Sequence, residues 1–131
     1  MNKYAQPDRR PAIVSGASSG IGAATAAALA AAGHPVALGA RRVEKCEEVA
    51  AAIRDQGGEA VTHPLDLHES ESVAAFAKAV TADLGDIEVV VSNAGAVAPG
   101  TIHEVDHDRS VRVHSVNVRG FASVPVTVVA R

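Results

Sequence analysis

Three glycines stand close together near the start of the chain, within Ser15-Gly16-Ala17-Ser18-Ser19-Gly20-Ile21-Gly22. Without a Cβ, Gly16 can make a tight turn, Gly20 lets the backbone approach a ligand, and Gly22 allows close helix packing. Free N–H groups at the start of a helix, together with the aligned peptide dipoles, favour a pyrophosphate. The segment is therefore either a phosphate-binding turn or a plain tight connection, and its position between a buried strand and an uncharged helix favours the first.

A regular alternation of elements positions this turn. Residues 12–15 form a short apolar run that predicts a buried parallel strand, and residues 20–32 are strong helix formers that end where Gly33 can supply a left-handed cap. Strands are also predicted at residues 36–40, 59–65 and 87–91, with amphipathic helices between them. The clearest helical stripe is Val73, Phe76, Ala77, Val80 and Leu84. Strands that alternate with helices pair in parallel, so the fold class is α/β.

The pattern weakens beyond residue 96. Residues 97–107 are predicted as a loop, and a helix is predicted from about Asp106, with a kink at Pro125 because proline removes a helical hydrogen bond.

Composition and charge narrow the class of protein. The chain has 131 residues, enough for one domain, and its 47% hydrophobic and 21% charged residues are ordinary globular usage. Its net charge is −3 with no long run of either sign, which argues against nucleic acid or anionic lipid as a partner. A single cysteine, Cys46, and a polar lead over residues 1–10 fit a reducing cytosol, and no stretch is long enough to cross a bilayer.

Four motifs in register resemble the short-chain dehydrogenase/reductase family. The Gly-x-x-x-Gly-x-Gly spacing with Ser18-Ser19-Gly20-Ile21-Gly22 resembles its cofactor signature. Leu65-Asp66-Leu67 is similar to the element whose Asp contacts the adenine, and Asn93-Ala94-Gly95 resembles the motif that closes the fourth strand near the cofactor ribose. Asn117 resembles the helix asparagine that supports a proton-relay water in the family's catalytic tetrad.

The resemblance runs from about Pro11 to the end of the chain. It implies a Rossmann-like doubly wound parallel sheet of about four strands, with residues 11–131 as a partial NAD(P)-binding domain that is truncated at its C-terminal side. The family's domain is about twice this long.

The end of the second predicted strand indicates which dinucleotide is bound. Folds specific for NAD place an acidic residue there, against the ribose 2′-hydroxyl. This chain has Ala40 followed by Arg41 and Arg42, and a guanidinium can hold a 2′-phosphate by charge-assisted contacts. NADP(H) is therefore favoured over NAD(H). Two solvated arginines that open a helix are the alternative.

The sequence departs from the family in its catalytic residues. The family uses a substrate-orienting Ser, a Tyr as general acid or base, and a Lys four residues beyond that Tyr, which lowers the tyrosine pKa. The one tyrosine here, Tyr4, is followed four residues later by Asp8, and it precedes the first predicted strand. The resemblance thus implies a cofactor-binding half that is inactive alone.

Three functions remain open. The first is a short-chain oxidoreductase that interconverts an alcohol and a carbonyl on a small molecule with NADP(H), represented by its cofactor-binding half. The second is a noncatalytic dinucleotide-binding or interaction module that keeps the glycine turn, Arg41 and Asp66. The third is a translated remnant without a stable fold.

Two other features could carry chemistry. His103-Glu104-Val105-Asp106-His107 matches the zinc-protease pattern, with His114 as a conceivable third ligand, but so short a match arises easily by chance, and we predict no metal site. Cys46 lies on the apolar face of a predicted helix and is expected to be a core residue rather than a nucleophile.

The fourth predicted strand has an open edge. Val89-Val90-Val91 carries neither proline nor charge to protect it, so we expect self-association through this strand.

Overall fold

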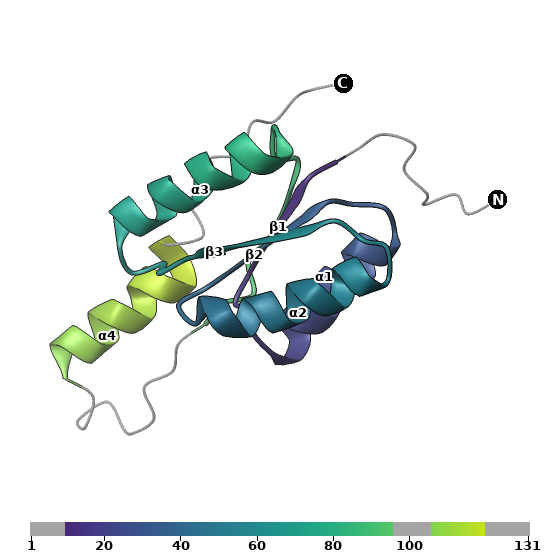
Figure 1. Ribbon diagram of the computed structural model, residues 1–131. Helices are drawn as coiled ribbons and strands as arrows, with labels where there is room; N and C mark the ends of the chain where they lie inside the picture. The colour runs from purple at the N-terminus through teal and green to yellow at the C-terminus, as the bar shows by residue number, and fades with distance from the viewer. Residues whose placement is uncertain (1–9, 96–105, 120–131) are drawn as a thin grey trace.

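Four parallel strands form the centre of the protein. The computed structural model describes residues 10–95 and 106–119. The sheet has the order β3-β2-β1-β4, and every pair is parallel. The strand bounds are Ala12–Ser15 for β1, Val36–Ala40 for β2, Ala60–Pro64 for β3 and Val89–Val91 for β4. The predicted α/β class with a doubly wound parallel sheet is confirmed (Figure 1).

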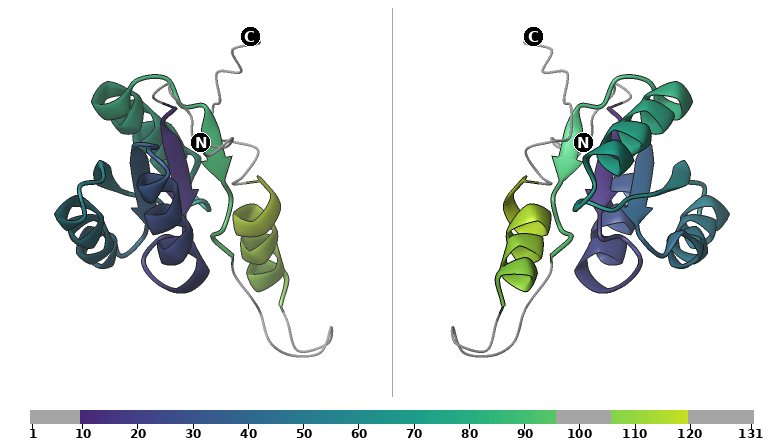
Figure 2. Two further views of the ribbon diagram at one scale, coloured as in Figure 1. Left: turned by 90° about the vertical axis from the view of Figure 1, so that its right-hand side faces the viewer. Right: turned by 90° about the vertical axis from the view of Figure 1, so that its left-hand side faces the viewer.

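Helices cover both faces of this sheet. The helices α1 (Gly20–Ala31) and α2 (Val43–Asp55) lie below the strands in Figure 1, and α3 (Ser70–Leu84) lies above them. A shorter helix, α4 (His107–His114), continues into a π-helical turn, η1, over Ser115–Arg119. Figure 2 shows β4 and α4 together at one side of the molecule and α2 at the other.

The two faces bury separate hydrophobic clusters because side chains alternate along each strand. Ala12 and Val14 pack with residues of α1 and α2, whereas Ile13 between them packs with residues of α3. Four residues of the predicted α3 stripe belong to the second cluster: Val73, Phe76, Val80 and Leu84. Phe76 is 1% exposed there. Cys46 lies fully buried in the first cluster, as predicted, and burial raises the pKa of its thiol.

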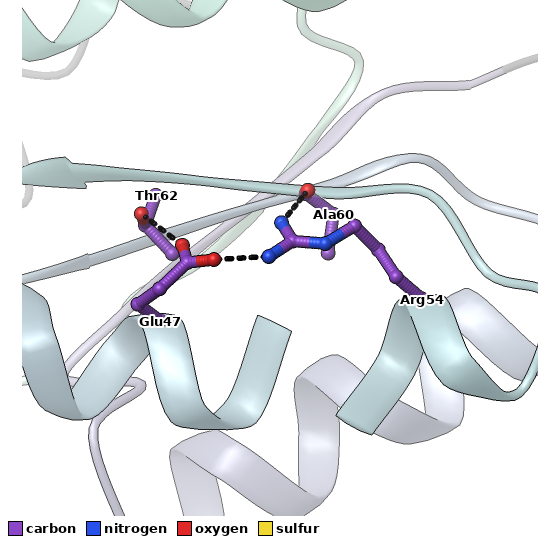
Figure 3. Close-up of polar contacts among 4 residues, drawn as sticks. All are labelled: Glu47, Arg54, Ala60 and Thr62. Carbon is purple, nitrogen blue, oxygen red and sulfur yellow. Dashed lines mark hydrogen bonds and ion pairs between the residues drawn. The ribbon is translucent and has the colours of Figure 1, made fainter. Parts of the chain in front are cut away.

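Hydrogen bonds tie α2 to the outer strand β3 (Figure 3). Glu47 pairs with Arg54 on α2 and accepts a bond of 2.9 Å from Thr62 Oγ1 on β3. Arg54 Nη1 also donates to the carbonyl oxygen of Ala60 at 2.9 Å. The bond from Thr62, and then that from Arg54, lowers the pKa of the Glu47 carboxyl. This network ties α2 to β3.

Most element boundaries agree with the sequence analysis. Gly33 follows α1 with a φ of +96°, the left-handed conformation expected of a cap. The fourth strand is shorter than predicted: Ile87 is buried in the second cluster but precedes the hydrogen-bonded ladder. The predicted helix near Asp106 is confirmed, and the Asp106 side chain caps it by accepting a bond of 2.8 Å from Arg109 N.

Some sequence predictions concern residues outside the described ranges. Residues 1–9 of the predicted lead, residues 97–105 of the predicted loop and the segment around Pro125 are among them. Arg10 belongs to the described part, and its Nε donates to Glu88 Oε2 at 3.1 Å. Within residues 10–95 and 106–119, no helix is long and apolar enough to cross a membrane.

Candidate functional site

A cleft of about 530 Å³ opens at the carboxyl ends of the strands. The turns that follow all four strands contribute to its wall, and Arg112 of α4 and Val116 of η1 also line it. The central strand β1 pairs with β2 on one side and with β4 on the other. The connection after β1 leads to β2, whereas the connection after β3 leads back to β4 on the opposite side of β1. Open α/β sheets bind ligands at such a switch point.

The glycine turn is closely packed against the loop after β4. Gly16 has a φ of +66°, and its N–H donates to the carbonyl oxygen of Gly39 at 2.8 Å. A Cβ built on Gly16 would lie 2.8 Å from Ala94 Cα, so a larger residue would need the backbone to move. A Cβ on Gly22 would lie 2.3 Å from the Gly16 carbonyl oxygen. These two glycines let the start of α1 sit directly under the turn.

The N–H groups at the start of α1 are not capped by the helix's own side chains, neither by a hydrogen-bond acceptor on the N-cap residue nor by a nearby acidic group. Its N-cap residue, Ser19, makes no side-chain cap hydrogen bond, and the first turn holds no acidic residue. Ser18 and Ser19 both line the cleft. The first N–H groups of a helix lack intrahelical acceptors and carry partial positive charge, so an anion at this end of the cleft would be stabilised.

Ser15 joins the end of β1 to the loop after β4. Its buried hydroxyl accepts bonds of 3.1 Å from the N–H groups of both Asn93 and Ala94, and donates to the carbonyl oxygen of Val91 at 3.4 Å. Asn93 Nδ2 in turn donates to the Gly16 carbonyl oxygen at 3.1 Å. These bonds fix the distance between the glycine turn and the Asn93-Ala94-Gly95 segment. The sequence motifs do not indicate this role for Ser15, because it depends on the approach of the loop after β4.

Two guanidinium groups stand at the end of β2. Arg41 and Arg42 are exposed and line the cleft beside Ala40. Neither forms an ion pair with any residue in the described part of the chain. Arg42 is also the N-cap residue of α2 and makes no side-chain cap bond. Both charges are thus free to meet an anionic ligand.

A carboxylate lies on the cleft wall, after β3. Asp66 Oδ1 accepts a bond of 3.0 Å from His68 N, and Asp66 N–H donates to Ser72 Oγ at 2.9 Å. The neighbouring Leu67 is buried in the second cluster and also lines the cleft. Asp66 therefore offers a fixed hydrogen-bond acceptor beside an apolar surface.

The structure brings most of the predicted site residues to this cleft, with four exceptions. Gly20, Ile21 and Gly22 are not on its wall, and the Ile21 side chain is 78% exposed. Asn117 is exposed on η1 next to the cleft, and its Oδ1 would lie 3.6 Å from a Cβ on Gly95.

The structure adds wall residues that were not among the predicted cofactor-binding residues. They are Gly39, Ala40, Leu65, Arg112 and Val116.

The zinc-protease pattern lies partly outside the described residues. His107 begins α4, whereas residues 103–105 are not described. In the part of the chain that the structure covers, no group of three His, Cys, Asp or Glu side chains could hold a metal ion.

Comparison with known proteins assigns this architecture. A family model described as short chain dehydrogenase matches residues 10–131. The chain belongs to the short-chain dehydrogenase family. The cis-4-hydroxycyclohexanecarboxylate dehydrogenase of Sinomonas cyclohexanicum, which is similar to it, is 40% identical over 114 residues, 86% of this chain and 45% of that enzyme.

Solved structures of the family superpose closely on the chain. An alcohol dehydrogenase from the archaeon Thermococcus sibiricus, complexed with 5-hydroxy-NADP, has a TM-score of 0.84 at 38% identity and covers 89% of this chain and 50% of that one. A metagenomic short-chain oxidoreductase in complex with NADP has a TM-score of 0.84 at 40% identity, covering 88% and 52%. The chain spans about half the length of the family members it matches.

Proposed function

We propose that the cleft binds a nicotinamide dinucleotide, NADP(H) in preference to NAD(H), and that the chain is the cofactor-binding part of a short-chain oxidoreductase. The observation that carries this proposal is the combination of an uncapped α1 start with two guanidinium groups on the cleft wall that form no ion pair within residues 10–95 and 106–119. The bound NADP of the metagenomic relative and the 5-hydroxy-NADP of the archaeal one support it.

The glycine turn is the proposed diphosphate site. Main-chain N–H groups at residues 18–22 would donate to the diphosphate oxygens, and Gly16 lets this turn pack against Ala94 without a side chain between them. Asn93, which holds the Gly16 carbonyl, keeps the turn in position. The absence of a side chain at Gly16 therefore sets the position of the turn against the loop after β4.

The turn after β2 is the proposed site of selection between the two dinucleotides. A 2′-phosphate carries close to two negative charges, and Arg41 and Arg42 can donate charge-assisted hydrogen bonds to it. No acidic residue stands at the end of β2 to accept a bond from a 2′-hydroxyl instead. One hydrogen bond to a charged group contributes roughly 1.5–3 kcal/mol, about tenfold to a hundredfold in affinity.

The reaction we propose for the whole protein is the interconversion of an alcohol and a carbonyl on a small molecule. The cofactor would supply or accept the hydride, and Asn117 on η1 would hold a water in a proton relay. The sequence has no Tyr-x-x-x-Lys pair to donate the proton, so we propose that this chain does not turn over substrate by itself.

A noncatalytic dinucleotide-binding module, which keeps Gly16 of the glycine turn, Arg41 and Asp66 around one cleft, is the second candidate. Both candidates predict cofactor binding. The first candidate also predicts that oxidoreductase activity appears when a segment that carries the Tyr-x-x-x-Lys pair is added to this chain.

The buried, single Cys46 supports the expectation of a reducing compartment such as the cytoplasm.

The test is a calorimetric titration of the full chain with NADPH and NADH. We expect Arg41→Ala to weaken NADPH binding by tenfold or more and to leave NADH binding nearly unchanged. Arg109→Ala is the matched control, because Arg109 is also exposed but does not line the cleft. Equal losses for both dinucleotides would defeat the proposed selection, and a folded chain that binds neither would defeat the proposed function.

A further inference from the structure

The helix α4 adds a guanidinium to the cleft that belongs to none of the sequence motifs. Arg112 on α4 and Val116 on η1 both line the cleft and are four residues apart, so they lie about one turn apart on the same side. Val116 is half-buried and packs against the second hydrophobic cluster. This packing turns the helix side that carries Val116 and Arg112 toward the cleft. Arg112 is exposed and forms no ion pair with any residue in the described ranges.

The surface next to Arg112 is apolar. Leu67 is 7% exposed, and Ala94 and Val116 pack against the same cluster, so the three supply an apolar floor to this part of the cleft. Asp66 stands beside Leu67 as a hydrogen-bond acceptor. A purine base has two apolar faces and an exocyclic amino donor, and this combination of surfaces suits it.

Stacking partners for such a base are scarce in this protein. The sequence has two Phe, one Tyr and no Trp, and Phe76, the one of these three residues that the structure describes, is buried in the second cluster and is not part of the cleft wall. Among the described residues that line the cleft, the planar side chain contributed by α4 is the guanidinium of Arg112. Guanidinium groups are weakly hydrated for their charge and stack on aromatic faces.

We propose that Arg112 stacks on the purine base of the bound dinucleotide and covers it from the α4 side. This inference rests on the proposed function, because it needs a dinucleotide in the cleft. It assigns Arg112 a different task from that of Arg41 and Arg42, which follow β2 and would meet the phosphate. Arg112 adjoins the apolar floor through Val116, so its guanidinium contacts the part of the ligand that NADH and NADPH share.

The experiment compares three ligands on the full chain. NADPH, NADH and ADP-ribose all contain the base, whereas only NADPH has the 2′-phosphate and ADP-ribose lacks the nicotinamide. We expect Arg112→Ala to raise the dissociation constant of all three by the same factor, roughly threefold to thirtyfold. Arg112→Lys, which keeps the charge but loses the planar group, should restore little of the affinity. Arg109→Ala on the same helix should change none of the three.

Each outcome separates this inference from the proposed function. A loss confined to NADPH would overturn the stacking role and place Arg112 with the phosphate-binding arginines. Unchanged binding by Arg112→Ala, with Arg41→Ala still selective against NADPH, would overturn this inference alone. A folded wild-type chain that binds none of the ligands would overturn both. Circular dichroism of each variant checks that the exposed substitution leaves the fold intact.

Discussion

Replacing Gly16 by alanine tests how closely the proposed phosphate-binding turn is packed. The residue has a φ of +66°, where a side chain is strained by roughly 1–2 kcal/mol. The new Cβ would also lie 2.8 Å from Ala94 Cα and 3.0 Å from Asn93 Nδ2. Because Ala94 Cα is backbone, the loop after β4 must shift, and such overpacking adds about 1–3 kcal/mol. The expected loss in the free energy of unfolding is therefore about 2–5 kcal/mol.

Gly57→Ala is the matched control for this prediction. Gly57 has a φ of +87° and no atom within 4 Å of a built Cβ, so its substitution carries the conformational strain alone. Urea unfolding followed by circular dichroism should give Gly57→Ala a loss of about 1–2 kcal/mol, clearly smaller than that of Gly16→Ala. NADPH affinity should fall only in Gly16→Ala. Equal losses of stability would refute the account of the close approach to Ala94.

Four further outcomes are expected. Glu47→Gln should reduce the free energy of unfolding at neutral pH, and the difference in stability between the variant and the wild type should shrink as the pH falls below about 4.5. The reason is that a carboxyl with a lowered pKa stabilises the fold only while it is ionised. Urea midpoints across pH measure this difference. Ser15→Ala should cost about 1–3 kcal/mol in urea unfolding, since two N–H groups after β4 lose their acceptor. The Cys46 thiol should react with a disulfide reagent no faster than the protein opens, because burial raises its pKa. Size exclusion at increasing concentration should show self-association, because Val89–Val91 forms the edge of the described sheet, and a concentration-independent monomer would contradict this.

The fold was predictable from the sequence where the burial pattern and the hydrogen-bond pattern coincide. Residues 36–40 are an apolar run that also pairs on both sides, and predicted and observed bounds of β2 agree. At the fourth strand the two patterns separate, because Ile87 is buried by α3 without joining the ladder. Apolar sequence reports burial, and pairing depends in addition on where the neighbouring strand begins.

The site was predictable where short-range spacing carries the chemistry. The glycine turn, Asp66 and the Asn93 segment each follow a strand directly, so the parallel sheet brings them to one edge. Arg112 and Val116 come instead from the helical region after residue 105, and only the packing of Val116 on the second cluster turns them to the cleft. Their spacing of four residues indicates a shared helix face but gives no information on what that face meets.

The most direct test of the central claim is an NMR titration of the full chain with NADPH. Binding at the proposed diphosphate site should shift the amide signals of residues 16–22, 93–95 and 41–42 together. The amide signals of residues 56–59, at the opposite end of the sheet, should not shift. Saturable shifts confined to the apolar groove between α1 and α2, which Gly33, Gly57 and Gly58 help to line, or no shifts at all, would contradict the claim.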